Sequence, residues 1–178
     1  MTVMENREFL IPLNGLASGG TRFRWKADGK FFDDFGNADI LDADIVAEAV
    51  AVKNSGGVRV DCSIIGTVTV QCDRCMDDLV LPVDTEVSLK LRYNAPADGT
   101  DDEDGCETVS VSAEDHDFDM RQTVYDYVCV SLPMQRFHND GECNPEMIER
   151  LGRGITVTGT ETDENPFESL RELFPEKK

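Results

Sequence analysis

Apolar and polar side chains alternate most regularly between Leu79 and Tyr93. Most odd-numbered positions there are apolar, and the even-numbered positions from Asp84 to Arg92 are polar. A period of two places the two sets on opposite faces of an extended chain, so the pattern predicts a long antiparallel strand with one buried face. Similar alternation from Val58 to Val70 predicts a second long strand.

A turn signal stands before that second strand. The run Asn54-Ser55-Gly56-Gly57 is typical of a tight hairpin turn, and it connects to Ala43–Lys53, whose small and β-branched residues suit either a helix or a strand. We interpret the pair as a β-hairpin. Cys62 falls in register with the apolar face, which predicts a small buried side chain.

Shorter strands are predicted near the start of the chain, at Phe9–Leu13 and Thr21–Lys26. In the latter, Phe23 and Trp25 share one face. The other face carries three cations, Arg22, Arg24 and Lys26. It is either the solvated side of an edge strand or a surface for a phosphate backbone.

The second half of the chain predicts another strand and two helices. Glu107–Ala113 has the strand pattern. Asp117 or Asp119 is expected to cap a helix that runs to about Ser131 and ends at Pro133. Its inner face would hold Val124, Tyr127, Val128 and Ser131, with Cys129 in the core. Pro145 can begin a short helix that extends to Leu151.

The C-terminal segment predicts one more helix. Asn165 is in the cap position, Pro166 in the first position and Glu168 in the capping-box position. Phe167, Leu170, Leu173 and Phe174 form its apolar stripe.

An acidic segment of about residues 94–106 interrupts the strands. It combines Pro96 and glycines with a run of aspartates, and such a segment repels itself and cannot bury enough apolar surface to order. The aspartates lack the spacing of a calcium loop. We therefore expect a flexible acidic loop, with Cys106 beside it not acting as a ligand.

Together these elements predict the α+β class. We expect an antiparallel, partly barrel-like sheet with two or three packed helices and a possible zinc knuckle. The predicted domain spans residues 1–160, and residues 161–178 are expected to form a C-terminal helix that is either docked or a tail.

Charge argues against generic nucleic-acid binding. The 178 residues include 17 Lys+Arg and 36 Asp+Glu, for a formal net charge of −19. Phosphate binding depends on cations that release counterions, so direct RNA contact would be weak unless the few basic residues converge. An acidic surface either keeps a protein soluble or recruits a basic partner.

The six cysteines are expected to be thiols or metal ligands. The segment Met1–Ile11 lacks the apolar core of a signal peptide, and no run reaches the length of a membrane span. A reducing, cytoplasmic setting without a membrane follows, in which disulfides are rare.

Cys72-Asp73-Arg74-Cys75 lies between the two long predicted strands. Two thiols three positions apart can bind one metal ion, and His138 and Cys143 in a later polar turn would complete a Cys3His set. Thiolate and imidazole suit zinc, and four protein ligands would leave no open position, so the site would be structural.

Two alternatives for this pair stay open. In the first, Cys72 and Cys75 are free thiols and His138 is a surface histidine. In the second, the two cysteines form a redox dithiol, but thioredoxin-like pairs open a helix, whereas Met76-Asp77-Asp78 leads directly into a strand. The two carboxylates would moreover raise the thiol pKa. Two histidines and no known catalytic motif leave little acid–base machinery, so we do not expect an enzyme.

The order of these features resembles the YceD family of bacterial proteins, also called DUF177, which has relatives in plastids. The most specific match is the strand end Gly66-Thr67-Val68-Thr69-Val70-Gln71-Cys72-Asp73-Arg74-Cys75. The strand after it, the helix ending in Leu132-Pro133, the Cys143 turn and the Asn165-Pro166-Phe167 helix also match. Many relatives carry a cysteine cluster after the Leu-Pro, of which this chain keeps Cys143 and offers His138. Phe167 stands where an arginine is common.

The resemblance implies a non-enzymatic role in accumulation of large-subunit ribosomal RNA (23S rRNA) in the cytoplasm. With the net charge of −19, it favours ribosome biogenesis through a protein partner, either a basic ribosomal protein or an rRNA-processing factor. Direct RNA contact would need Arg22, Arg24, Lys26 and Arg74 on one surface. The alternatives are a zinc-stabilised protein-interaction module unrelated to ribosomes and, third, a thiol oxidoreductase.

Overall fold

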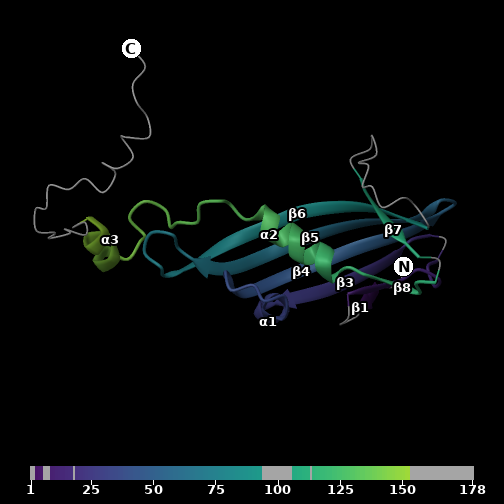
Figure 1. The fold of residues 1–178 in the computed structure, drawn as a ribbon, viewed down its shortest axis with the longest axis horizontal. Coiled ribbons are helices and arrows are strands. Elements are labelled where there is room, and N and C mark those ends of the chain that lie inside the picture. Colours follow the sequence, from purple (N-terminus) through teal and green to yellow (C-terminus); the bar gives the residue numbers. More distant parts are fainter. Residues whose placement is uncertain (1–2, 6–8, 18, 94–105, 113, 153–178) are drawn as a thin grey trace, which may run out of the picture. The chain divides into compact units, whose positions relative to one another are not determined.

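The computed structural model describes residues 3–5, 9–17, 19–93, 106–112 and 114–152. It divides the chain into two compact units, Met1–Cys143 and Asn144–Lys178. The first unit holds both sheets and two helices (Figure 1). In the second unit, the described part is the helix α3 (Pro145–Gly152), which begins at the predicted proline.

A six-stranded sheet dominates the first unit, in the order β1-β3-β4-β5-β6-β7. Its strands are β1 (Val3–Glu5), β3 (Thr21–Asp28), β4 (Ile40–Asn54), β5 (Gly57–Gln71), β6 (Asp78–Tyr93) and β7 (Glu107–Val111). The four central strands pair antiparallel, whereas β1 pairs parallel to β3 and β7 pairs parallel to β6. A small second sheet joins β2 (Leu10–Pro12) to β8 (Asp117–Asp119).

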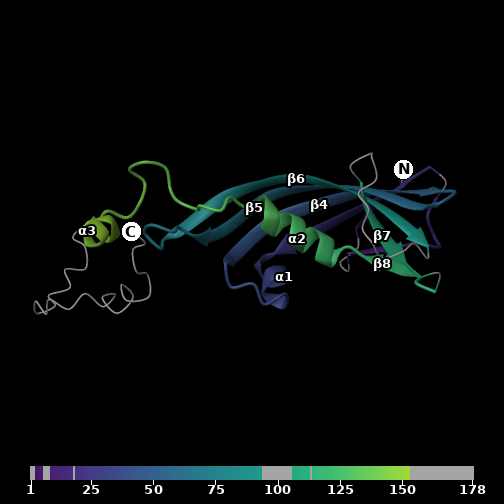
Figure 2. The ribbon, with the colours of Figure 1, turned by 45° about the horizontal axis from the view of Figure 1, so that its top comes forward.

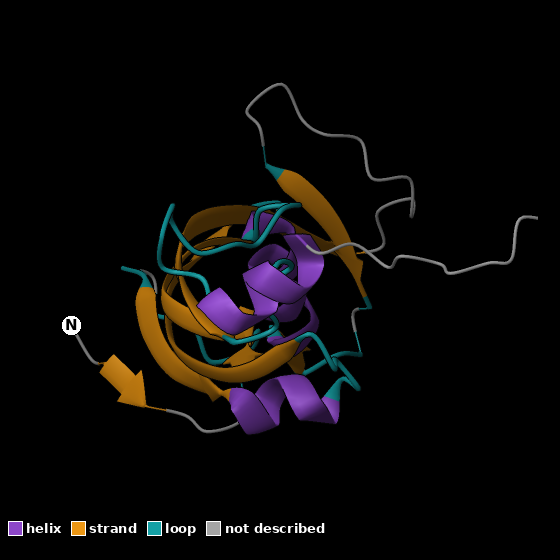
Figure 3. Cartoon of the chain, turned by 90° about the vertical axis from the view of Figure 1, so that its left-hand side faces the viewer, coloured by secondary structure: helices purple, strands orange, loops and turns teal. Residues whose placement is uncertain are grey.

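The predicted α+β class is confirmed. The large sheet curves strongly when viewed along its length (Figure 3), but it is not a closed barrel, because β1 and β7 lie at its two edges. The predicted hairpin also forms: β4 and β5 pair from Ile40–Val70 to Asn54–Gly57, so the ambiguous segment is a strand.

The apolar faces of the central strands make the core. Inward side chains alternate with exposed ones along β3, as Phe23, Trp25 and Ala27 are buried and the residues between them are exposed. The Phe9 ring stacks on Trp25 at 5.6 Å. Because β4, β5 and β6 follow the same alternation, the sheet has one apolar inner face and one solvent-facing outer face.

Two helices cover the inner side of this sheet. α1 (Gly29–Asp34) was not anticipated from the sequence; Asp28 caps it by accepting from the Phe31 N–H at 3.1 Å, and Phe31 and Phe32 are buried. α2 (Arg121–Ser131) lies across one face of the sheet (Figures 1 and 2) and buries Val124 and Val128.

The predicted start of α2 is wrong. Its N-cap is Met120, which makes no side-chain cap hydrogen bond and is fully buried, while Asp117 and Asp119 belong to β8. The helix start is therefore held by the buried methionine instead of a polar cap. Asp119 is close by, and its Oδ1 accepts from the Arg121 N–H at 2.8 Å. Ser131 is exposed and Cys129 is half-buried, so neither is the core residue that was predicted.

Several predictions lie outside the described residues. They are the acidic loop from residue 94 to 105 and the C-terminal segment 161–178, so the proposed domain limits stay a prediction. Cys106, at the loop's end, is buried. No helix within the described ranges is long and apolar enough to cross a membrane.

Gly66 permits a close approach between β4 and β5. Its φ of 159° is close to extended, and a Cβ built on it would overlap the carbonyl oxygen of Asp44 and lie 2.7 Å from the Cα of Ile45. The obstructing atoms are backbone atoms in the middle of a paired strand, so they cannot move aside cheaply. The glycine ahead of the cysteine pair is therefore required by strand packing.

Replacing Gly66 with alanine should lower the free energy of unfolding by about 2–4 kcal/mol, because the new methyl group must displace the β4 backbone. Urea titration measures the change. Gly56→Ala is the matched control, since a Cβ at Gly56 meets no atom within 4 Å. Equal stability of the two variants would contradict the packing account.

Candidate metal centre

A tight turn between β5 and β6 carries Cys72 and Cys75. The Cys72 N–H donates to the Asp77 carbonyl at 2.9 Å, and the Met76 N–H donates back to the Cys72 carbonyl at 2.9 Å. Met76 has a φ of 63°, the left-handed region that non-glycine residues seldom adopt. These two bonds hold the strained residue in place and close the turn around the thiols.

A second segment, the chain from Arg136 to Cys143, is fastened to this turn by backbone and side-chain contacts. The Asp73 N–H donates to the Arg136 carbonyl at 2.7 Å, and the Arg136 N–H donates to Asp73 Oδ2 at 2.7 Å. We refer to this reciprocal pair as the Asp73–Arg136 clasp. It brings the later segment alongside the turn.

Arg74 adds a third attachment. Its guanidinium lies 4.2 Å from the centroid of the Phe137 ring, and it lies 3.9 Å from Asp140. The Asp140 side chain is fully exposed, so the ion pair contributes little, and the stacking on Phe137 is the larger effect, at about 0.5–1 kcal/mol. The arginine between the two cysteines thus positions the segment that carries His138.

These attachments bring the four predicted ligand residues together. One ligand atom from each of Cys72, Cys75, His138 and Cys143 lies within 4.8 Å of the others, and the group could hold a metal ion. Cys72 and Cys75 are buried, whereas His138 and Cys143 are half-buried. We refer to these residues as the Cys3His cluster.

The spacing of the ligand atoms fits a tetrahedral centre. Bonds of about 2.3 Å to sulfur and about 2.0 Å to nitrogen separate two sulfurs by about 3.8 Å, and a sulfur from a nitrogen by about 3.5 Å. Cys72 Sγ and Cys143 Sγ are 3.9 Å apart. His138 Nδ1 lies 3.4 Å from Cys75 Sγ and 4.0 Å from Cys143 Sγ. The cluster therefore needs little rearrangement to surround one ion.

The ring orientation of His138 also suits a ligand. Nδ1 faces the sulfurs, while Nε2 lies 3.1 Å from the Asp78 carbonyl oxygen. A carbonyl can only accept, so Nε2 carries a proton, and in the neutral ring Nδ1 directs its lone pair at the cluster. Metal-binding histidines typically have such a second hydrogen bond, which fixes both tautomer and ring plane.

The pKa values within the cluster differ. Burial raises the pKa of Cys72, but hydrogen bonds from the backbone of Cys75, Arg74 and His138 outweigh it and bring the pKa to about 6. The hydrogen bond with Cys72 raises the pKa of His138, and burial raises that of Cys143. Cys72 therefore loses its proton at a lower pH than Cys143 does.

The expectation that Asp77 and Asp78 would raise the pKa of the thiols is wrong for Cys72. Backbone donors from the turn and from His138 dominate, and the sequence does not show them because they depend on how the turn closes and where the second segment lies. By contrast, burial alone raises the pKa of Cys62 on the inner face of β5 to about 12. The strand–turn–strand setting of the pair still differs from the helix start of thioredoxin-like motifs.

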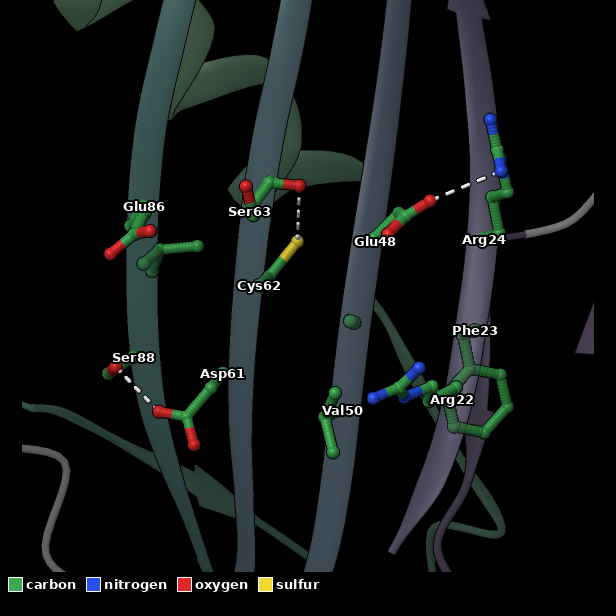
Figure 4. A pocket seen from close by; sticks show the side chains of 12 residues that line it. Arg22, Phe23, Arg24, Glu48, Val50, Asp61, Cys62, Ser63, Glu86 and Ser88 are labelled. Carbon is green, nitrogen blue, oxygen red and sulfur yellow. Dashed lines mark hydrogen bonds and ion pairs between the residues drawn. The ribbon is translucent and has the colours of Figure 1, made fainter. Parts of the chain in front are cut away.

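The predicted basic face on β3 is not a separate cationic surface. Figure 4 looks onto the outer face of the sheet, where Arg22 and Arg24 line a pocket of about 690 Å³ together with Glu48, Asp61 and Glu86. Arg24 pairs with Glu48 at 3.2 Å. Carboxylates thus offset the positive charge of Arg22 and Arg24. Arg74 lies at the β5–β6 turn, where it contacts Phe137 and Asp140.

Comparison with known proteins adds the family. No curated protein and no solved structure matches the chain. A family model described as "Large ribosomal RNA subunit accumulation protein YceD" matches residues 60–174, which include the Gly66 approach and all four residues of the Cys3His cluster. The chain therefore belongs to the YceD family, whose description connects it with accumulation of large-subunit ribosomal RNA.

Proposed function

We propose that this protein is a non-enzymatic factor in large-subunit ribosomal RNA accumulation that acts in the cytoplasm through a protein partner. The family match over residues 60–174 carries the proposal. A formal net charge of −19 favours a protein partner over direct RNA contact, because an acidic surface repels phosphates. A basic ribosomal protein or an rRNA-processing factor has the complementary charge.

The Cys3His cluster serves this function by holding a structural zinc ion. Three sulfurs and one imidazole nitrogen are the donor types that zinc prefers, and their separations suit a tetrahedral centre. When bound, zinc would supply only cross-linking, because four protein donors leave no position for a water or a substrate. The ion would hold the segment from Arg136 to Cys143 against the β5–β6 turn.

A second candidate function is a zinc-stabilised interaction module unrelated to ribosomes. The same cluster would support it, and the two candidates differ only in the partner. A thiol oxidoreductase ranks third: the pKa of about 6 at Cys72 suits a nucleophilic thiol, and activity in an insulin-reduction assay would favour it.

Purified protein should contain one equivalent of zinc, and Cys72→Ser should lose it, since three remaining donors cannot complete the set. Elemental analysis after dialysis measures the stoichiometry. Cys129→Ser is the matched control, because Cys129 accepts a hydrogen bond from Asn37 and is not one of the four cluster residues, so this variant should keep the zinc. Zinc retained at full stoichiometry in Cys72→Ser would rule out this ligand set.

The ribosomal function is tested by co-purification. Tagged full-length protein should enrich precursors of the large subunit over those of the small subunit, as measured by quantifying both ribosomal RNAs in the eluate. Treatment with RNase should leave the associated proteins bound, because the proposed contact is with protein. An eluate without large-subunit enrichment would favour the second candidate.

A further inference from the structure

Aliphatic side chains stand on the outer face of the sheet, where solvent-facing positions are normally polar. Ile65 is 55% exposed and Val80 is 61% exposed. Val46 pairs directly with Ile65, and Pro82 is the diagonal neighbour of Ile65 across β5 and β6. These four residues, which we name the aliphatic stripe, run continuously across three strands near the β5–β6 turn.

Carboxylates flank the aliphatic stripe. Asp44, Asp84 and Glu86 point outward from β4 and β6, and none of them forms an ion pair with a residue that the structure describes. Asp44 lies directly opposite Asp28 on β3, an arrangement of like charges that destabilises a sheet. Asp28 has a separate task as the cap of α1, but nothing within the fold explains Asp44.

Cations are unevenly distributed along this outer face. Toward the β4–β5 hairpin, the outward positions carry Arg22, Arg59, Lys90 and Arg92, with Asp61 beside them. Around the aliphatic stripe, the outward positions of β3 to β6 from residues 26–28, 42–46, 65–69 and 80–84 hold a single cation, Lys26. The stripe is therefore complementary to a cationic partner, and its carboxylates would repel a nucleic-acid backbone.

The open edge of β6 does not offer an alternative mode of binding. β7 pairs with β6 only from Leu89 onward, which leaves the earlier part of β6 without a strand partner on that side among the described residues. Pro82 lies in this part and has no N–H to donate, as is common on strands that must not accept another strand. Contact through the outer face is thus favoured over strand addition.

We infer that the aliphatic stripe and its flanking carboxylates form the docking surface for a cationic amphipathic segment of the partner protein. The inference rests on the proposed function, and it names the chemistry of the partner: lysine or arginine alternating with aliphatic side chains. The aliphatic residues would bury Ile65 and Val80, and the cations would pair with Asp44 and Asp84.

Titration of the full-length protein with two synthetic peptides tests this surface. One peptide alternates lysine with valine, the other alternates lysine with serine, and both have the same charge and length. At about 0.15 M salt, where exposed charges are screened, the lysine–valine peptide should bind about tenfold more tightly because it buries the stripe. Its amide chemical-shift changes should centre on Ile65 and Val80. Equal affinity, or shifts elsewhere, would overturn the inference.

Two variants and two controls make the test specific. Ile65→Thr combined with Val80→Thr keeps β-branched side chains, so the strands should persist while binding falls about tenfold. Asp84→Lys should weaken binding by a similar factor. The controls Val130→Thr and Asp33→Lys make the same changes on α2 and α1 and should bind like the unaltered protein. If the controls weaken binding as much as the variants, the stripe is not the site.

A 23S rRNA fragment serves as the opposing probe. If it binds at the aliphatic stripe and displaces the lysine–valine peptide, the surface recognises RNA and the inference is wrong. The proposed function can fail independently: absence of large-subunit precursors in the co-purification would refute the function, whereas precursors retained equally by the Ile65→Thr/Val80→Thr variant would refute only this docking surface.

Discussion

Closure of the Cys3His cluster depends on joining two segments that are far apart in the chain. Cys75 and His138 are separated by 63 positions, and bringing such segments together costs conformational entropy. The Asp73–Arg136 clasp and the stacking of Arg74 on Phe137 each contribute on the order of 1 kcal/mol, and the His138–Asp78 hydrogen bond adds to them. A structural zinc site contributes about 10–16 kcal/mol in small zinc-finger peptides, so the metal would decide whether the segment stays attached.

The division of the sheet into an apolar inner face and a solvent-facing outer face determines where the helices pack and where charged side chains lie. Residues buried on the inner face of β3 to β6 pack with α1 and α2, and the outer face is left to solvent. The chain turns at Cys72 and Cys75, and both thiols stay buried where β5 ends and β6 begins. Carboxylates occur along the whole outer face, but most of its cations lie toward the hairpin, which a net charge of −19 does not reveal. Toward the turn, carboxylates stand beside exposed aliphatic residues, and Lys26 is the one cation on the outward positions described there.

Much of this arrangement could be predicted because side-chain alternation in a strand is local. The pattern from Leu79 to Tyr93 was sufficient to assign β6 and its buried face, and Asn54–Gly57 was sufficient to place the hairpin. The four candidate ligands were also foreseen, since their residue types and spacing restrict the choice. Their donor types and separations suit zinc.

Other features depend on contacts that the sequence does not display. α1 has only six residues, too few to show a helical period, and burial of its Phe31 and Phe32 depends on the packed core. α2 begins where Met120 is buried, not at the aspartate that a capping rule selects. The low pKa of Cys72 arises from backbone donors of the closed turn and of His138. The parallel pairing of β1 with β3, and that of β7 with β6, are equally non-local.

X-ray absorption at the zinc edge of the purified protein tests the central claim most directly, because it reports the donors around the ion rather than its presence alone. The account predicts a four-coordinate shell of three sulfurs at about 2.3 Å and one nitrogen at about 2.0 Å. A shell made only of oxygen and nitrogen, or one with fewer than three sulfurs, would contradict it.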